Sequence, residues 1–147
     1  MPNSLNALQA VEIEINHACN RSCTYCPNSI LERKTKGIMS LETYEMVIKN
    51  LVDLDFSGRI SYDFYNEPML HPQFTEIVRL TKKILPKSKI HLYSNGTLLT
   101  ENKFQELVKN GIDKFVITQH EQDENKENYI FNDVFKSLDT ADREKVI

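Results

Sequence analysis

Alternating apolar and polar residues mark strands along this chain, and a helical pattern follows each of them. The predicted strands cover residues 11–16, 60–65, 89–93 and 113–118. The predicted helices, in which apolar side chains recur at helical spacing, cover residues 41–54, 72–85, 101–110 and 129–138. Strands that alternate with helices indicate βαβ units, in which the strands are parallel and the crossovers are right-handed.

Residues that favour helix ends support these boundaries. The sequence offers N-caps at Ser40 and Thr100, a first-turn proline at Pro72 and a C-terminal stop at Gly111. After the last predicted strand, residues 121–128 are polar and acidic, and we predict a solvated loop there. Residues 144–147 are predicted to begin a fifth strand.

The first two predicted strands each have one apolar and one polar face, although strands of parallel sheets are usually continuous apolar runs. The side chains predicted to face the helices are Val11, Ile13, Ile15, Ile60, Tyr62 and Phe64. The side chains predicted for the other face are Glu12, Glu14, Asn16, Ser61, Asp63 and Tyr65, together with His91 and Tyr93. A curved sheet whose polar face lines a lumen explains this pattern, and an open sheet with one wetted face is the alternative. The curved sheet makes the fold class α/β, a partial parallel barrel.

Composition and charge argue against several classes of partner. The chain has 147 residues, enough for one domain with a sizeable core, and its 18 basic and 21 acidic residues give a net charge of -3. This balance lacks the basic field of nucleic-acid-binding proteins. No apolar run approaches the roughly 18 residues of a membrane span, and residues 1–20 show no charged-then-apolar leader. We therefore expect no nucleic-acid partner, no membrane partner and a cytoplasmic location.

Every cysteine of the chain lies in one CxxxCxxC segment, at Cys19, Cys23 and Cys26, directly after the first predicted strand. An odd number of cysteines in a cytoplasmic protein favours metal ligands over disulfides. Thiolates are soft ligands that suit iron–sulfur clusters, and a 4Fe-4S cluster held by three of them keeps one iron open. A zinc site is the alternative, and it would need a fourth ligand such as His17.

The strand that leads into CxxxCxxC, with an aromatic residue just before the last cysteine, resembles the cluster loop of the radical S-adenosylmethionine (SAM) enzymes. The resemblance implies that Cys19, Cys23 and Cys26 bind a 4Fe-4S cluster. It also implies that the amine and carboxylate of SAM chelate the fourth iron, and that Tyr25 lies against the adenine.

Two further segments strengthen the resemblance. Residues 65–68, Tyr-Asn-Glu-Pro, are similar to a family motif of two glycines, an acidic residue and a proline. This implies that Glu67 accepts a hydrogen bond from the SAM amine. Tyr65 and Asn66 replace the glycines, whose missing side chains permit close backbone approach. A strand-to-helix turn, in which Glu67 is a solvated or helix-dipole residue, is the alternative.

The segment Ser94-Asn95-Gly96 is similar to the Thr-Asn-Gly stretch at the end of the family's third strand. It implies that Ser94 and Asn95 contact the carboxylate or ribose of SAM, whereas a turn that merely ends the strand is the alternative. Gln119 and His120 follow the fourth predicted strand, where barrel enzymes place reactive groups, although a polar strand exit explains them as well.

The resemblance implies that residues 1–147 are a radical SAM core domain with about four to five βα units, incomplete at the C-terminus. It implies reductive cleavage of SAM to a 5'-deoxyadenosyl radical, which takes a hydrogen atom from a peptide or small-molecule substrate. The electron would come from a donor such as flavodoxin or ferredoxin. The motifs look most like members that carry a SPASM-type, cysteine-rich C-terminal extension. Two alternatives are an iron–sulfur electron-transfer module without SAM chemistry and a catalytically silent fragment of the fold.

Overall fold

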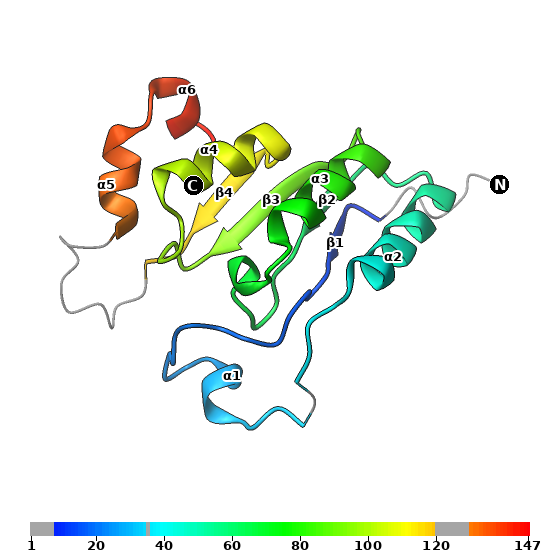
Figure 1. Cartoon of the computed structure of the whole chain (residues 1–147), viewed down its shortest axis with the longest axis horizontal. Coiled ribbons are helices and arrows are strands. Elements are labelled where there is room, and N and C mark those ends of the chain that lie inside the picture. The colour runs from blue at the N-terminus through cyan, green and yellow to red at the C-terminus, as the bar shows by residue number, and fades with distance from the viewer. Residues whose placement is uncertain (1–7, 35, 120–129) are drawn as a thin grey trace.

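The computed structural model describes residues 8–34, 36–119 and 130–147. Its centre is a sheet of four parallel strands in the order of the chain (Figure 1). The strands are β1 (Ala10–Glu12), β2 (Arg59–Ser61), β3 (Lys89–Ser94) and β4 (Lys114–Ile117). The predicted parallel α/β architecture is therefore confirmed.

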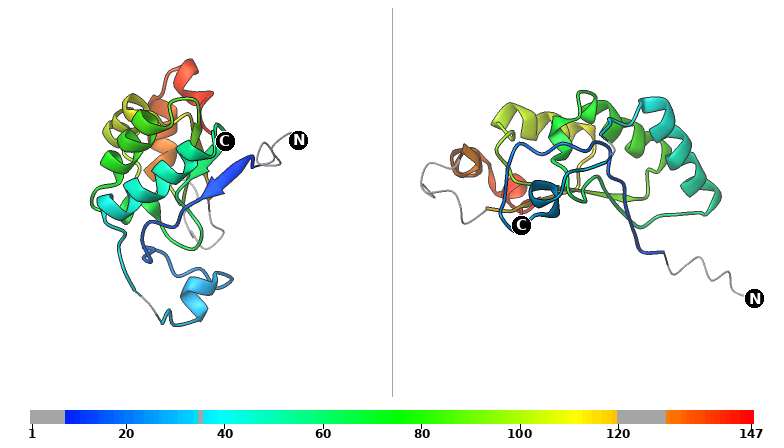
Figure 2. Two further views of the ribbon diagram at one scale, coloured as in Figure 1. Left: turned by 90° about the vertical axis from the view of Figure 1, so that its right-hand side faces the viewer. Right: turned by 90° about the horizontal axis from the view of Figure 1, so that it is seen from below.

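Three of the helices connect the strands and lie along one face of the sheet, a short helix in the segment after the cysteines lies away from the sheet, and the last two helices follow the fourth strand. The elements are α1 (Pro27–Ile30), α2 (Leu41–Asp53), the 3-10 helix η2 (Pro68–Leu70), α3 (Phe74–Ile84), α4 (Glu101–Asn110), α5 (Ile130–Ser137) and α6 (Thr140–Arg143). Helix α3 packs between α2 and α4, and the two turned views show these three helices on the same side of the strands (Figure 2). Each βα unit thus brings its next strand back parallel to the last.

The core lies between the sheet and these helices. Ile60 of β2 and Tyr62 just after it are fully buried, and the hydroxyls of Tyr62 and of Tyr44 in α2 both lie within hydrogen-bonding distance of Thr81 Oγ1 in α3, at 2.9 and 2.6 Å. Ile13 and Ile15 are buried as well. Burying one such large apolar side chain contributes about 1.5–3 kcal/mol. The prediction that these four side chains face the helices is confirmed, although Ile13, Ile15 and Tyr62 lie just beyond the ends of β1 and β2.

Phe64 is an exception, because 63% of its surface is exposed. The second strand ends at Ser61 rather than at residue 65, and residues 62–67 form a turn that we call the Glu67 turn. Within it the backbone N–H of Phe64 donates to Asn66 Oδ1 at 3.0 Å, which breaks the strand alternation. The first strand is also shorter than predicted and ends at Glu12.

Two of the side chains predicted for the polar face, Glu12 and Tyr93, contact Arg59, which was not among the predicted residues. Arg59 of β2 donates to the hydroxyl of Tyr93 in β3 at 2.8 Å, and its other terminal nitrogen lies 3.4 Å from Glu12 of β1. The guanidinium also lies 5.6 Å from the centre of the Tyr93 ring. These contacts cross three neighbouring strands, so the polar residues share one face of the sheet.

The predicted helix ends are confirmed with one correction. Ser40 caps α2 by accepting from the N–H of Thr43, and Thr100 caps α4 in the same way. Gly111 ends α4 in the left-handed region, with φ of 117°, and a Cβ there would lie 2.8 Å from Lys82 Cγ. Pro72 was predicted in the first turn of α3 but precedes its N-cap, Gln73. The proline position at a helix start is taken instead by Pro68 in η2.

The strand predicted to begin at residues 144–147 is confirmed only in part, because Glu144 still has helical backbone as the C-cap of α6 and the pairing with β4 is a single bridge at Val146. Val146 forms a parallel bridge with Phe115 of β4, and Ile147 N donates to Phe115 O at 2.8 Å. The predicted loop at 121–128, the first residue of the helix predicted from 129, and His120 lie outside the described residues. In the described part of the chain, no helix has the length and apolar content to cross a membrane.

Candidate active site

The carboxyl ends of the first three strands open on one cavity of about 250 Å³, which we call the site pocket. Its lining includes the seven site residues predicted from the three motifs: Cys19, Cys23, Tyr25, Cys26, Glu67, Ser94 and Asn95. The remaining lining residues are Arg21, Asp63, Phe64, Tyr65, Asn66, Tyr93 and Thr118. Parallel barrels place their active sites at this end of the strands. Three segments that are far apart in the sequence thus meet at one place.

The cysteine loop, residues 19–26, forms one wall of the pocket. Its thiols are free; Cys23 is buried, and Cys19 and Cys26 are partly exposed. Cys26 is also the N-cap residue of α1, where Pro27 begins the helix. Burial raises the pKa of the Cys19 thiol. Among the described residues, no three Cys, His, Asp or Glu side chains already stand in a metal-binding arrangement.

The chemistry of the donor set nevertheless fits an iron–sulfur cluster. Three free thiols line one pocket, and thiolates are the ligands that such clusters use. Metal binding and the ordering of the ligand segment are commonly coupled, because the ligands must lose protons and converge on the metal.

His17 does not join the cysteines. It lines a separate cavity of about 380 Å³, and its Nδ1 accepts from the backbone N–H of Gly37 at 3.0 Å. The zinc alternative needed His17 as its fourth ligand. This geometry gives that alternative no support.

Glu67 lies at the back of the pocket and is only 1% exposed. Its carboxylate accepts from the hydroxyl of Ser94 at 3.0 Å, from the N–H of Asn95 at 3.0 Å and from the N–H of Met69 at 3.2 Å. Its own N–H donates to Ala18 O at 2.8 Å, which ties it to the start of the cysteine loop. The alternative of a solvated Glu67 is therefore wrong. Its helix-end form is met in part, because Glu67 is the N-cap of η2 and its side chain accepts from the N–H of Met69.

The charge of Glu67 has no cation beside it in the described structure. Burial raises its pKa, and the donors from Asn95, Met69 and Ser94 offset only part of that effect. No ion pair joins it to a lysine or arginine among the described residues. A buried carboxylate that is held only by neutral donors is suited to receive a positively charged group from a ligand.

Asn95 links the Glu67 turn to the cysteine loop. Its backbone donates to Glu67, while its side-chain nitrogen donates to Asn20 Oδ1 at 2.9 Å and lies 3.9 Å from Cys19 Sγ. The next residue, Gly96, has φ of 72°, and its N–H donates to Ser94 Oγ at 2.9 Å. The segment after β3 thus ends the strand and also orients groups toward the pocket.

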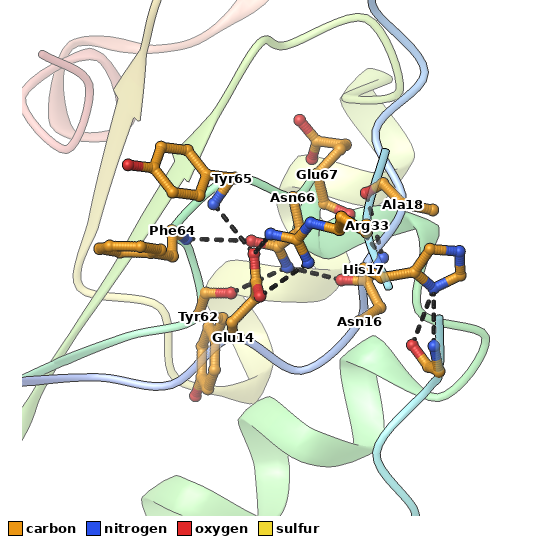
Figure 3. Close-up of polar contacts among 11 residues, drawn as sticks. Glu14, Asn16, His17, Ala18, Arg33, Tyr62, Phe64, Tyr65, Asn66 and Glu67 are labelled. Carbon is orange, nitrogen blue, oxygen red and sulfur yellow. Dashed lines mark hydrogen bonds and ion pairs between the residues drawn. The ribbon is translucent and has the colours of Figure 1, made fainter. Parts of the chain in front are cut away.

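Sequence reasoning assigned no role to the polar network behind Glu67. Asn16 donates to Glu67 O at 3.2 Å and accepts from Asn66 Nδ2 at 2.5 Å (Figure 3). Nearby, both terminal nitrogens of Arg33 contact the carboxylate of Glu14. The sequence showed Asn16 only as a polar-face residue and Asn66 only as a replacement for a motif glycine, and the partner of Arg33 lies 19 positions away.

Two further residues complete the description of the pocket. Oδ1 of Asp63 is buried without a hydrogen-bond partner in the described structure, and burial raises the pKa of this carboxyl group. Tyr25 lines the pocket with 63% of its surface exposed. Gln119 is not among the residues that line the pocket, whereas the preceding Thr118 is.

The parallel α/β fold and a cysteine-lined pocket at the carboxyl ends of its strands define the class of protein. A family model described as the Radical SAM superfamily matches residues 13–146, and the chain belongs to that superfamily.

Individual relatives agree with this assignment. The chain is 42% identical over 137 residues to the S-adenosyl-L-methionine-dependent 2-deoxy-scyllo-inosamine dehydrogenase of Niallia circulans, covering 93% of this chain and 53% of that protein. It is similar to the crystal structure of BtrN in complex with AdoMet and 2-DOIA, with a TM-score of 0.87 and 41% identity over 95% of this chain and 55% of that one. Native anSMEcpe with bound AdoMet is more distant, with a TM-score of 0.59 and 27% identity over 74% of this chain and 30% of that one. The chain thus spans about half the length of the first two.

Proposed function

We propose that this chain binds a 4Fe-4S cluster and SAM in the site pocket, as part of an enzyme that removes hydrogen from a small polar substrate. The observation that carries the proposal is the meeting of the three thiols with Glu67, a buried carboxylate that lacks a cationic partner in the described structure. When bound, the cluster and SAM supply one-electron reduction of the sulfonium and abstraction of a hydrogen atom.

Each site residue has a defined part in this proposal. Cys19, Cys23 and Cys26 hold the cluster. The carboxylate of Glu67 accepts a hydrogen bond from the ammonium group of SAM. Ser94 and Asn95 hold the Glu67 carboxylate in place. The side chain of Asn95 contacts the carboxylate or ribose of SAM. Ser94, whose one hydroxyl hydrogen is donated to Glu67, contacts the ribose as an acceptor. Tyr25 covers the adenine from the exposed side of the pocket.

The proposed reaction is oxidation of an alcohol in a small, polar substrate to a carbonyl group. SAM would be the net two-electron oxidant: it would be consumed as methionine and 5'-deoxyadenosine, and one proton would be released. Support comes from the relative in Niallia circulans, named a 2-deoxy-scyllo-inosamine dehydrogenase, with which this chain shares 42% identity. The pocket also contains Asp63, whose unpartnered oxygen can accept from a hydroxyl or ammonium group. A small acidic redox protein such as flavodoxin or ferredoxin is the proposed source of the electron.

An electron-transfer module without SAM chemistry is less well supported. Such a module needs the thiols but gives no reason for a buried Glu67 fixed by Ser94 and Asn95. The SAM-bound relatives also favour SAM chemistry.

Anaerobic reconstitution with iron and sulfide, followed by dithionite and SAM, tests the proposal. We expect 5'-deoxyadenosine in the wild-type reaction, measured by liquid chromatography, and none in the Cys23→Ala variant or without dithionite. A reconstituted cluster that yields no 5'-deoxyadenosine would support the electron-transfer module. A wild-type chain that binds neither iron nor SAM would contradict the proposal altogether.

A further inference from the structure

Two residues that bracket the cysteine loop are joined by an ion pair. Arg33 Nη1 lies 2.9 Å from Glu14 Oε2, and Nη2 lies 2.7 Å from Oε1 (Figure 3). Both side chains are largely sheltered, with 22% exposure for Arg33 and 27% for Glu14. Two parallel charge-assisted hydrogen bonds give this pair a fixed geometry. The pair therefore closes the segment of chain that contains every cysteine.

The same carboxylate also holds the Glu67 turn. Glu14 Oε1 accepts from the backbone N–H of Tyr65 at 3.0 Å. Burial opposes the charge of Glu14, but Arg33 and the N–H of Tyr65 outweigh it and hold the pKa of Glu14 below its usual value. One ionised group thus meets donors from the segment that follows the cysteine loop and from the Glu67 turn, although Glu14 and Arg33 themselves line the separate cavity of about 380 Å³ beside His17.

Hydrogen bonds of Asn66 and Asn16 link the Glu67 turn to the backbone of Glu67. The side chain of Asn66 donates to Asn16 Oδ1 at 2.5 Å and to Tyr62 O at 3.1 Å, and it accepts from the N–H of Phe64. Asn16 in turn donates to Glu67 O. Side-chain hydrogen bonds therefore fix a turn in which the family motif has glycines, so the backbone of the turn depends on its polar neighbours for its position.

We propose that the Glu14–Arg33 pair is a clasp that couples the cysteine loop to the Glu67 turn, which makes Glu14 and Arg33 positioning residues for SAM. This inference rests on the proposed function, because the proposed function assigns the Glu67 turn to SAM binding. The clasp acts at two points: Arg33 closes the cysteine loop, and the free lone pairs of Glu14 hold Tyr65.

The chain offers a matched control for this clasp. Arg79 and Glu76 form a similar two-point pair on the exposed side of α3, with 52% and 41% exposure. Neither residue lines the site pocket. Substitutions of that pair change the same chemical groups without touching the loop or the turn.

The test measures three quantities on the anaerobically reconstituted chain: iron and sulfide content, the Kd of SAM by titration calorimetry, and Tm by circular dichroism. Glu14→Gln places an amide against Arg33, and Arg33→Lys removes the two-point contact while keeping the charge. We expect both variants to bind SAM about tenfold more weakly. We expect Glu76→Gln and Arg79→Lys to bind SAM as the wild type does, with comparable changes in Tm.

A double variant that exchanges the two residues, Glu14→Arg with Arg33→Glu, separates closure of the cysteine loop from the hydrogen bond to Tyr65. The exchanged pair can still close the cysteine loop, so we expect wild-type iron content. An arginine at position 14 has no acceptor for the N–H of Tyr65, so we expect SAM affinity to stay about tenfold weaker.

Three results would overturn the inference. SAM affinities of Glu14→Gln and Arg33→Lys that match those of the α3 controls would show that the pair does not position SAM. Full recovery of SAM affinity in the exchanged variant would show that loop closure alone matters. Failure of the wild type itself to bind SAM would instead refute the proposed function on which the inference rests.

Discussion

Two carboxylates at opposite ends of the sheet are satisfied in opposite ways. Asp113, just before β4, forms ion pairs with Lys82 at 3.1 Å and Lys89 at 3.0 Å, and it accepts from the N–H of Ile90. Burial opposes the charge of Asp113, but these donors outweigh it and lower its pKa. Glu67, at the carboxyl end of the sheet, meets only neutral donors, and burial raises its pKa.

The contrast separates a group that stabilises the fold from a group that is prepared for a ligand. The charge of Asp113 is neutralised within the chain, so its main effect is on the free energy of unfolding. The charge of Glu67 remains uncompensated among the described residues and costs the folded protein stability until a cation arrives. This division agrees with barrel enzymes, in which the carboxyl ends of the strands carry the chemistry.

The largest expected effect tests the Glu67 side of the contrast. Glu67→Gln removes the charge that receives the SAM ammonium group, so we expect SAM to bind about tenfold to hundredfold more weakly. Titration calorimetry on the reconstituted chain measures the change, with the exposed Glu106→Gln as control. Equal affinities of the two variants would show that Glu67 is not a SAM ligand.

We expect Asp113→Asn to lower the stability of the fold and to leave SAM affinity unchanged, the reverse of what we expect for Glu67→Gln. Loss of its ion pairs and of part of its hydrogen bonding is expected to lower the free energy of unfolding by about 1 kcal/mol. SAM affinity should remain that of the wild type, because Asp113 does not line the site pocket. Urea unfolding and calorimetry on the same preparation measure both quantities. A loss of SAM affinity without a loss of stability would remove the distinction between the two ends of the sheet.

The pH dependence of stability sharpens the contrast, because the two carboxylates contribute with opposite signs. Asp113 has a lower pKa in the folded state than in the unfolded state. Its contribution to the free energy of unfolding is therefore complete above the unfolded pKa of 3.8 and is lost as the pH falls through the folded pKa. The raised pKa of Glu67 means that the folded state loses stability as pH rises from 4.5 through its folded pKa.

Urea midpoints between about pH 3 and pH 7 check these signs. The difference between wild type and Asp113→Asn should shrink below pH 3.8. The wild type should gain stability relative to Glu67→Gln as the solution becomes more acidic. Parallel profiles for the two variants would contradict the opposite pKa shifts.

The smallest expected effect concerns Ser94. Its hydroxyl donates to Glu67, and Ser94→Ala removes this support while leaving the N–H of Asn95 in place. We expect SAM affinity to fall about threefold. Ser94→Thr keeps a hydroxyl and serves as the control. Unchanged affinity in Ser94→Ala would mean that the backbone donors alone hold the carboxylate.

The sequence predicted the order of elements, the apolar core and the meeting of the site residues, because each depends on local periodicity and on the shared direction of parallel strands. Ser94 and Glu67 could be placed together in this way, although 27 positions separate them. Local patterns did not reveal the exposure of Phe64, which follows from a side-chain hydrogen bond to its backbone. They also did not reveal the pairing of Glu14 with Arg33, since a contact between distant charged residues leaves no periodic signal.

The EPR spectrum of the dithionite-reduced, reconstituted chain, recorded with and without SAM, tests the central claim most directly. We predict that SAM changes the signal of the wild-type cluster, and that Glu67→Gln requires far more SAM for the same change. A cluster that forms in the wild type but gives the same spectrum with and without saturating SAM would contradict the claim that this pocket brings SAM to the cluster.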